Sequence, residues 1–387
     1  MKTKPSLKVG LVVPHIFVHR DIMPNVIFSP GHLAIALAEG LRESGIEVTL
    51  FTPGPANVSV PSVTADLSGF ERELLNRGDS YLDLLKKHPF TFVTLARQVQ
   101  AELIAKAYAM ANDKKLDIVH IYTNEEDIAL PFANLCNKPV VFTHHDPFNF
   151  LIKYKSVFYK YAYLNWISLS LAQRKAMPSD TNWIANIYHG INPDCFEPNY
   201  TPSANYIAYL GRIIEPKGVH LAIAAIKQYN KKNNTLLKLK IAGKHYADPT
   251  KDNYWKTKIE PELNDTIEYV GFIKDDETKS EFLGNAKALI IPSLFDEPFG
   301  MVMIEALACS TPIIGLGSGA IAEVIQNNKN GLLVNKSKNN LRTITDLANA
   351  IEKVESIDRR VCRSDFENRF SLSRMCKDHL NAYQSLL

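Results

Sequence analysis

The sequence has few cysteines, and they form no pattern that holds a metal ion or a disulfide framework. The 387 residues contain no Cys-x-x-Cys pair and no cluster of cysteine with histidine. This distribution argues against a zinc site and a disulfide scaffold, and it predicts reduced thiols in a cytoplasmic protein. The five scattered cysteines are Cys136, Cys195, Cys309, Cys362 and Cys376.

Long apolar runs and blocks of like charge are also missing. No apolar run in the sequence reaches the roughly 20 residues of a membrane-spanning helix. The formal net charge of +3 is too small to indicate a nucleic-acid partner. Lysines precede the apolar run Val9–Val13, as in a signal peptide, but Pro14 interrupts the run and no small-residue cleavage site follows. We therefore expect a first buried strand there.

Two common glycine-rich nucleotide motifs are absent after this first predicted strand. There is no GxGxxG and no Walker lysine, which argues against an ordinary dinucleotide enzyme and a P-loop NTPase. A single glycine, Gly31, stands before the first predicted helix, where its backbone would be able to approach a phosphate.

The chain does have a regular alternation of strand and helix patterns. Its length exceeds the usual size of one core, and its 46% hydrophobic and 22% charged residues are ordinary for a soluble globular protein. The alternation predicts parallel strands, with ligands bound at their carboxyl ends. A proline-rich stretch, Asn192–Ala204, is interpreted as a linker. We expect an α/β fold of two Rossmann-like, doubly wound domains facing each other, residues 1–192 and 203–370.

The element bounds follow from the same patterns. Strands are expected at Leu7–Val13, Glu47–Thr52, Asp117–Ile121, Pro139–Thr143, Tyr206–Leu210, Leu237–Ala242, Ile267–Val270, 287–291 and 312–315. Helices are expected at His32–Ser44, Asp79–Lys87, Phe92–Asn112, Ile128–Asn137, Val219–Asn230, Tyr254–Leu263, 277–285, 301–309, 319–327 and about Asp365–Leu387.

Two segments of the first half stand out from the alternation. Residues 53–115 form an insertion at a strand end, where substrate selectivity usually lies, although a plain crossover with a long loop fits as well. Phe150–Lys175 is basic and aromatic and contains no acid. One interpretation is a helix that binds a membrane surface or an acceptor. The other, which we prefer, is a helix that faces the core and keeps its lysines in water.

Two glutamates, Glu297 and Glu305, stand eight residues apart around a Pro-Phe-Gly turn. A short apolar strand, residues 286–292, precedes them and an apolar helix pattern follows. This order predicts a helix N-terminus whose backbone amides bind an anion. A sugar nucleotide would supply both the anion and the hydroxyls that carboxylates bind. The amides are those of Phe299, Gly300, Met301 and Val302.

A second motif, Leu210-Gly-Arg-Ile-Ile-Glu-Pro-Lys-Gly218, places two cations beside a helix start. The Arg212 guanidinium offers a fork and the Lys217 ammonium a point charge, which together suit a diphosphate. A third motif, Val140-Val-Phe-Thr-His-His-Asp146, ends a strand with two histidines. Either His144 or His145 would face a substrate, with its ring oriented by Asp146.

Taken together, these motifs resemble the retaining glycosyltransferases of family 4, which have the GT-B fold. Glu297 and Glu305 match the E-x7-E motif of that family, in an EPFG-x4-E context. Its diphosphate loop matches LGR-x4-KG, and His145 falls at the position of its T-x-H loop. The Gly-Gly pair of the family is Pro30-Gly31 here, and Pro30 lacks an N–H donor.

This resemblance implies a donor site on the C-terminal domain and an acceptor site on the N-terminal domain. Glu305 would bind the ribose hydroxyls, while Arg212 and Lys217 would neutralise the diphosphate. Glu297 would hold the sugar, and His145 would line the reacting face. Further donor contacts are implied for Gly31, Gly211, Gly243, Phe272, Ile273, Phe299, Gly300, Met301 and Val302.

The implied reaction is hexose transfer from a nucleotide-diphosphate sugar to an acceptor hydroxyl, with retention by same-face attack. A carboxylate nucleophile is the other route to retention. No DxD motif is present, so neither a metal nor another cofactor is expected. The sequence does not distinguish UDP, GDP and ADP as the nucleotide of the donor. The final helix, residues 371–387, would cross back to the N-terminal domain.

Two other functions fit the same motifs. One is a phosphorylase on this fold, which would use inorganic phosphate in place of a nucleotide. The other is a nucleotide-sugar-binding protein with weak or no turnover. The expected partners are a nucleotide sugar and a carbohydrate, lipid-linked or small-molecule acceptor, with peripheral membrane contact through the basic aromatic segment and no nucleic acid.

Overall fold

The structure is a computed structural model that describes residues 6–26, 28–122, 126–148, 157–246 and 252–387. The chain divides into two compact units. The N-terminal unit comprises Met1–Leu169, Gln173–Tyr188 and Met375–Leu387, and the C-terminal unit comprises Ser170–Ala172 and His189–Arg374. The proline-rich stretch Asn192–Ala204, interpreted above as a linker, therefore belongs to the C-terminal unit.

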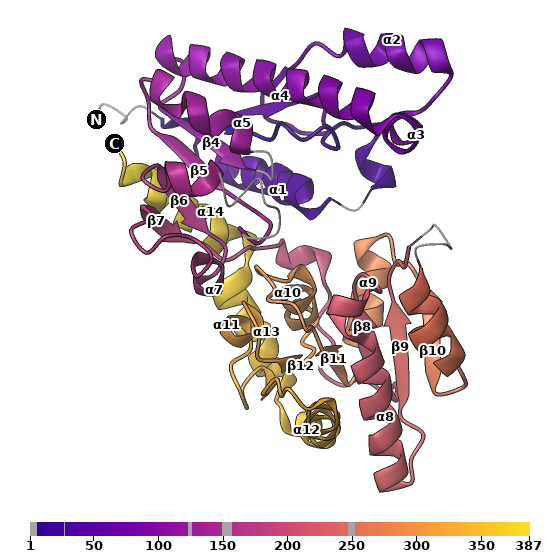
Figure 1. The fold of residues 1–387 in the computed structure, drawn as a ribbon. Helices are drawn as coiled ribbons and strands as arrows, with labels where there is room; N and C mark the ends of the chain where they lie inside the picture. The colour runs from indigo at the N-terminus through magenta and orange to yellow at the C-terminus, as the bar shows by residue number, and fades with distance from the viewer. Residues whose placement is uncertain (1–5, 27, 123–125, 149–156, 247–251) are drawn as a thin grey trace. The chain divides into compact units, whose positions relative to one another are not determined.

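The described residues of the N-terminal unit form a seven-stranded parallel sheet in the order β3-β2-β1-β4-β5-β6-β7 (Figure 1). The central strand β1 lies between β2 and β4, with Val9 opposite Val48 and Ile118. Every residue of β4 and β5 is buried, as expected for strands covered on both faces. The strands are β1 (Lys8–Val12), β2 (Glu47–Thr52), β3 (Ser62–Thr64), β4 (Ile118–Tyr122), β5 (Val140–Thr143), β6 (Asn165–Ser168) and β7 (Trp183–Asn186).

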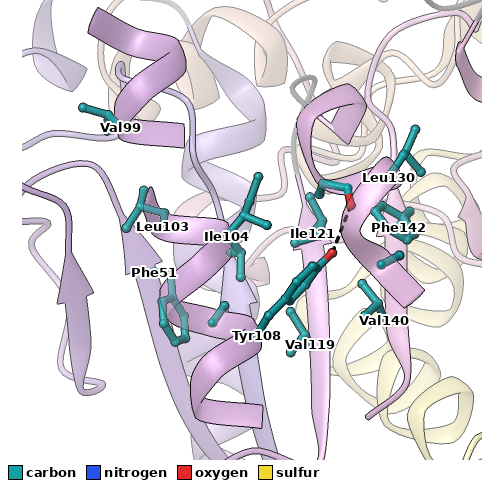
Figure 2. Packing of buried hydrophobic residues seen from close by; sticks show 14 of the residues in the cluster. Phe51, Val99, Leu103, Ile104, Tyr108, Val119, Ile121, Leu130, Val140 and Phe142 are labelled. Carbon is teal, nitrogen blue, oxygen red and sulfur yellow. Dashed lines mark hydrogen bonds between the residues drawn. The ribbon is translucent and has the colours of Figure 1, made fainter. Parts of the chain in front are cut away.

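Helix α4 supplies much of the apolar cover of this sheet. Figure 2 shows Tyr108 of α4 beside Val119 and Ile121 of β4, and Leu103 and Ile104 of α4 belong to the same buried cluster. The Tyr108 hydroxyl donates to the Ala129 carbonyl at 3.2 Å, so this polar atom is satisfied inside the core. The helices of the unit are α1 (Ser29–Glu43), α2 (Ser68–Arg77), α3 (Tyr81–Lys87), α4 (Pro89–Asn112), α5 (Glu126–Ala129) and, from Met375 on, α14 (Leu372–Gln384).

The C-terminal unit contains a six-stranded parallel sheet in the order β10-β9-β8-β11-β12-β13 (Figure 1). Because the strands are parallel, their carboxyl ends lie at one edge of the sheet. The strands are β8 (Tyr206–Leu210), β9 (Lys238–Ala242), β10 (Ile267–Gly271), β11 (Ala288–Ile291), β12 (Ile313–Leu316) and β13 (Gly331–Val334). The helices are α8 (Val219–Asn233), α9 (Asp276–Gly284), α10 (Met301–Ala308), α11 (Ile321–Val324), α12 (Asn340–Lys353) and α13 (Arg359–Phe370).

The last helix returns to the N-terminal unit, as the resemblance implied. Tyr383 of α14 is fully buried, and its hydroxyl lies 2.7 Å from His120 Nδ1 on β4. The other ring nitrogen of His120 lies 2.8 Å from Thr143 Oγ1 on β5. A buried polar chain therefore ties the end of the chain to two central strands. The helix predicted over Asp365–Leu387 is in fact two helices, α13 and α14, separated at Ser371.

The helix predicted over Phe150–Lys175 is wrong where the structure describes this segment, from residue 157 on. Asn165–Ser168 is strand β6, and the short helix α7 (Leu171–Arg174) follows it. Trp166 and Ile167 are buried, because this stretch extends a sheet instead of lying on a surface. Phe150 to Lys155 lie outside the described residues. None of the described helices is both long and apolar enough to cross a membrane.

Candidate functional site

The loop after β8 is shaped by glycines that allow backbones to touch. Gly218 has φ +70°, and a Cβ there would lie 2.0 Å from the Pro292 carbonyl oxygen after β11. Gly243 has φ +148°, and its Cβ would lie 1.8 Å from the Gly211 carbonyl oxygen. Only a residue without a side chain fits at either place. The loops that follow β8, β9 and β11 are therefore in direct contact, as the parallel sheet predicts.

Lys217 and Glu297 meet at this edge although they are 80 residues apart in sequence. Lys217 Nζ lies 2.5 Å from Glu297 Oε1, and Ser293 Oγ donates to the same oxygen at 2.9 Å. The side chains of Lys217 and Glu297 are only 20% and 8% exposed. Sequence reasoning placed these residues in one site but did not predict that they bond to each other. Here the cation and the carboxylate compensate each other's charge.

The backbone around Glu297 is held from three directions within the C-terminal unit. The Ala320 amide donates to the Glu297 carbonyl at 2.9 Å, and a Cβ on Gly319 would lie 2.6 Å from the Glu297 nitrogen. Ser170 Oγ donates to the Pro298 carbonyl at 2.8 Å. Phe299 is buried, with its ring 4.9 Å from the His189 ring. These contacts hold the acidic loop against other segments of the C-terminal unit.

Helix α10 begins directly after this loop. Its N-cap is Gly300, with φ +99°, and no side chain caps the helix. The first amides of a helix have no partner inside the helix, and they carry the positive end of its dipole. The amides of Met301 and Val302, four and five residues after Glu297, are therefore oriented as donors that suit an anion.

Glu305 lies on the second turn of α10, with its side chain 12% exposed. It bonds Lys279 of α9, whose Nζ donates to Glu305 Oε1 and to Asp276 Oδ1, each at 3.0 Å. Burial by itself lowers the pKa of Lys279, but Glu305 and Asp276 together raise this pKa above its ordinary value. Sequence reasoning missed Lys279, because its spacing from Asp276 is typical of a surface pair on a helix.

The remaining cation of the motif, Arg212, is exposed at the end of β8. Within the described residues, its guanidinium has no hydrogen-bond or ion-pair partner, whereas its carbonyl accepts from the Tyr209 hydroxyl at 2.8 Å. Its backbone is thus fixed while its side chain is available to a ligand. Arginine suits the bidentate binding of phosphate oxygens.

Phe272 and Ile273 follow β10 at the same sheet edge. Gly271 before them has φ +83°, which turns the chain out of the strand. Lys244 Nζ lies 4.1 Å from the centre of the Phe272 ring, and the Lys244 carbonyl accepts from the Ile213 amide at 2.8 Å. The predicted donor contacts after β9 and β10 therefore border the Arg212 loop.

In the N-terminal unit, the two histidines after β5 have different surroundings. His144 is fully buried, and its Nδ1 lies 2.9 Å from Glu126 Oε2, which is also fully buried. His145 is 8% exposed, with its ring centre 4.4 Å from that of Tyr122. Burial raises the pKa of Tyr122, so its hydroxyl stays protonated. His144 is therefore a core residue, and only His145 is left as the candidate for a substrate contact.

The prediction that Asp146 orients a histidine ring is wrong. Among the described residues, the Asp146 carboxylate contacts neither ring, and Glu126 occupies that position on His144. Gln173 Nε2 instead donates to the carbonyls of His144 and Asp146, at 2.9 and 3.1 Å. The backbone carbonyls of His144 and Asp146 are therefore tied to Gln173.

Gly31 has a packing reason to be glycine. It lies in the first turn of α1, where a Cβ would be 2.9 Å from Phe28 Cδ1 and 3.0 Å from Val18 Cγ2. Pro30 lies at one of the first two helical positions, where a missing N–H costs little. The departure from the Gly-Gly pattern is thus compatible with the helix start, and the donor contact implied for Gly31 stays a prediction.

Metal ligands and large hollows do not coincide with these residues. The described residues contain no group of three or more His, Cys, Asp or Glu side chains that would hold a metal ion. A hollow of about 560 Å³ lies between β13 and α12, but its lining includes none of the predicted site residues. The candidate site is therefore the set of converging charged residues at the sheet edge, which this hollow does not include.

Comparison with known families gives two matches, one for each half of the chain. The family described as Glycosyltransferase Family 4 matches residues 31–191. The family described as Glycosyl transferases group 1 matches residues 196–368, which contain the Lys217, Glu297 and Glu305 cluster. Together the two matched ranges cover most of the chain.

Individual relatives agree with these matches. An uncharacterised glycosyltransferase of Methanocaldococcus jannaschii is 26% identical over 342 residues, which cover 79% of this chain and 81% of that protein. The phosphatidyl-myo-inositol mannosyltransferase of Mycolicibacterium smegmatis is 25% identical, with 85% and 81% covered. The crystal structure of Anabaena HepE in complex with UDP-glucose is similar in fold, with a TM-score of 0.69, 15% identity, and 98% and 100% covered.

Proposed function

We propose that this chain, which belongs to the group 1 glycosyltransferases of family 4, moves a hexose from a nucleoside-diphosphate sugar to an acceptor hydroxyl with retention. The observation that carries this proposal is the meeting of Lys217 and Glu297 beside the uncapped start of α10. One edge of the sheet thus presents a cation, a carboxylate and backbone donors together. Those are the groups that a donor with both phosphates and sugar hydroxyls requires.

The diphosphate would lie at the cationic part of this edge. The Arg212 guanidinium is exposed and has no hydrogen-bond or ion-pair partner among the described residues, and Lys217 lies five residues later in the sequence. The HepE structure, which holds UDP-glucose, supports a nucleotide sugar as the ligand of this fold. Glu305, on the second turn of α10, would bind the ribose hydroxyls.

Catalysis would come from charge placed where charge develops. When the anomeric bond breaks, the diphosphate gains negative charge and the sugar gains positive charge. Arg212, Lys217 and the first amides of α10 would stabilise the leaving group more in the transition state than in the ground state. These cations would supply the neutralisation that a metal gives in other enzymes, so we propose transfer without a metal.

Retention would follow from attack on the same face, with a phosphate oxygen accepting the proton of the acceptor. Glu297 Oε1 already accepts from Lys217 Nζ and Ser293 Oγ, which compensates its charge and weakens it as a nucleophile. This supports same-face attack over a covalent glycosyl-enzyme. Glu297 would instead hold sugar hydroxyls. The acceptor would bind in the N-terminal unit, where His145 is the candidate contact.

The test is a transfer assay with UDP-, GDP- and ADP-hexoses against a panel of sugar, lipid-linked and small-molecule acceptors. We expect nucleoside diphosphate to be released in step with product, and the product to keep the anomeric configuration of the donor by proton NMR. Product with the inverted configuration would disprove same-face attack. Turnover that requires inorganic phosphate and releases no nucleotide would replace this function with a phosphorylase.

A further inference from the structure

Lys279 is a mostly buried cation beside the donor site, and the mechanism above gives it no role. Its side chain is 18% exposed, and that of its partner Glu305 is 12% exposed. Its other partner, Asp276, is 54% exposed and lies one turn earlier on α9. Removing charges from water is costly unless they are paired. The Lys279 and Glu305 pair is therefore the part of this small network that the fold protects from solvent.

The geometry leaves one oxygen of Glu305 for a ligand. Lys279 Nζ engages Oε1 at 3.0 Å, and within the described part of the chain no residue bonds to Oε2. Glu305 follows the first residue of α10, Met301, by four positions, which is about 6 Å along the helix axis. A nucleotide whose phosphates lie at the start of α10 would therefore bring its ribose within reach of this oxygen.

The lysine does not depend on Glu305 alone. Asp276 gives the ammonium a second acceptor, also at 3.0 Å. Although burial alone lowers the pKa of Lys279, the two carboxylates raise it overall, so the side chain is charged at neutral pH. A ligand hydroxyl can therefore bind Glu305 while Lys279 stays in place. The Phe196 ring, 5.8 Å from Nζ, covers another side of it.

We propose that Lys279 is a positioning residue: it fixes the Glu305 carboxylate so that the second oxygen accepts a ribose hydroxyl, and the site thereby selects ribonucleotides over 2′-deoxyribonucleotides. This inference rests on the proposed function, because it takes Glu305 as the ribose-binding group. A carboxylate that is held at one oxygen cannot rotate freely. The Glu305 side chain therefore loses less conformational entropy when it binds a ribose hydroxyl. The lysine touches no donor atom and acts through Glu305.

The experiment compares calorimetric affinities for nucleoside diphosphates and their 2′-deoxy forms, in uridine, guanosine and adenosine pairs. In the wild type we expect a ribose preference of about tenfold or more, as for a hydrogen bond to a charged group. Lys279→Met should reduce this preference to roughly twofold or less, since Glu305 loses its fixed orientation. Lys279→Arg, which can still pair with Glu305, should restore part of it.

A matched control is Lys287→Met. Lys287 precedes β11 in the same unit and pairs with Glu355, away from the predicted donor residues. It should keep the wild-type ratio between ribose and deoxyribose forms, so that general destabilisation is separated from positioning. If Lys279→Met does not fold, the ratio of ribose to deoxyribose affinities can be measured in Lys279→Arg and Asp276→Asn. In Asp276→Asn we expect this ratio to stay within about twofold of the wild-type ratio, because Lys279 still bonds Glu305.

Two outcomes would overturn the proposal, and they differ from failure of the function itself. A wild-type ratio in Lys279→Met, with Glu305→Ala still losing the ribose preference, would show that Glu305 needs no positioning. Tighter ribonucleotide binding by Lys279→Met would show that the lysine blocks Glu305 instead. By contrast, unchanged nucleoside-diphosphate affinity in Glu305→Ala would remove Glu305 from the donor site, and with it the ribose assignment of the proposed function.

Discussion

The two units of this molecule hold their candidate residues in different ways. In the C-terminal unit, side chains from separate loops bond to one another, as Lys217 does to Glu297. In the N-terminal unit, His144 turns into the core toward Glu126, and Gly31 packs on neighbouring side chains. Lys217, Glu297 and Glu305 are therefore held by polar contacts, whereas most candidates of the N-terminal unit are explained by packing.

This difference has a physical consequence for mutants. Polar groups arranged in advance need no reorganisation when charge develops, so their loss should appear mainly in turnover. Buried groups that complete a core should instead appear in the free energy of unfolding. Four variants or conditions, taken from the largest expected effect to the smallest, separate the two cases.

Lys217→Ala should have the largest effect on chemistry. We expect kcat/KM to fall because the activation free energy rises by about 2.7–4 kcal/mol. This is the scale for the loss of one donor that stabilises the charge developing in the transition state. The thermal midpoint should fall as well, because the variant leaves the Glu297 carboxylate, whose side chain is 8% exposed, without its cation. Steady-state kinetics and a thermal melt measure the two effects. Near wild-type turnover would remove Lys217 from the diphosphate site.

Gly243→Ala should destabilise the protein more than Gly45→Ala. Both glycines have positive φ, which costs an alanine about 1–2 kcal/mol. A Cβ at Gly45 would meet nothing within 4 Å, whereas one at Gly243 would lie 1.8 Å from the Gly211 carbonyl oxygen. Denaturant unfolding should show the larger loss for Gly243→Ala, together with weaker nucleotide binding. Equal losses would mean that the loops after β8 and β9 are not in close contact.

Acid should weaken the N-terminal unit through His120. Burial, followed by the neighbouring His379, holds the pKa of His120 well below its ordinary value of 6.5. Below pH 6.5 the unfolded chain therefore binds a proton that the folded chain does not, and stability falls as the pH is lowered. The slope should approach about 1.4 kcal/mol per pH unit for this one group. His120→Gln should flatten the unfolding free energy between pH 6.5 and 5, and an unchanged slope would contradict this assignment.

Asp146→Asn should have the smallest effect. Because the Asp146 carboxylate contacts neither histidine ring, we expect the free energy of unfolding to change by less than about 0.5 kcal/mol. Glu126→Gln, which replaces the carboxyl group bonded to His144 in the core, should cost clearly more. Chemical denaturation of both variants measures the difference. A reversed order would restore Asp146 as the partner of a histidine.

Many of the strands were predictable from the sequence, because the pattern of apolar residues that marks a buried strand is local. Tyr206–Leu210 forms a strand with the predicted bounds, since an apolar run of this length between turn residues fits a buried parallel strand. Convergence of Lys217 with Glu297 also followed from the rule that parallel strands end at one edge. The helix predicted over Phe150–Lys175 is wrong from residue 157 on, because aromatic residues suit a strand as well as a helix. Whether such a segment forms a strand depends on the neighbouring strands with which it pairs.

The details of the site depended on contacts that no local pattern contains. The partner of Lys279, Glu305, is 26 residues away on another helix, and only the packing of α9 on α10 brings the two together. The same holds for His144, whose partner Glu126 precedes it by 18 residues. Residue types and spacing therefore identified where the charges gather, but not which of them bond to each other.

The central claim is that the carboxyl edge of the C-terminal sheet binds a nucleoside diphosphate. The most direct measurement is calorimetric titration of the wild type and of Arg212→Ala with UDP, GDP and ADP. We expect one of them to bind to the wild type and to bind more weakly to Arg212→Ala. Absence of binding by all three, or equal affinity in the variant, would contradict it.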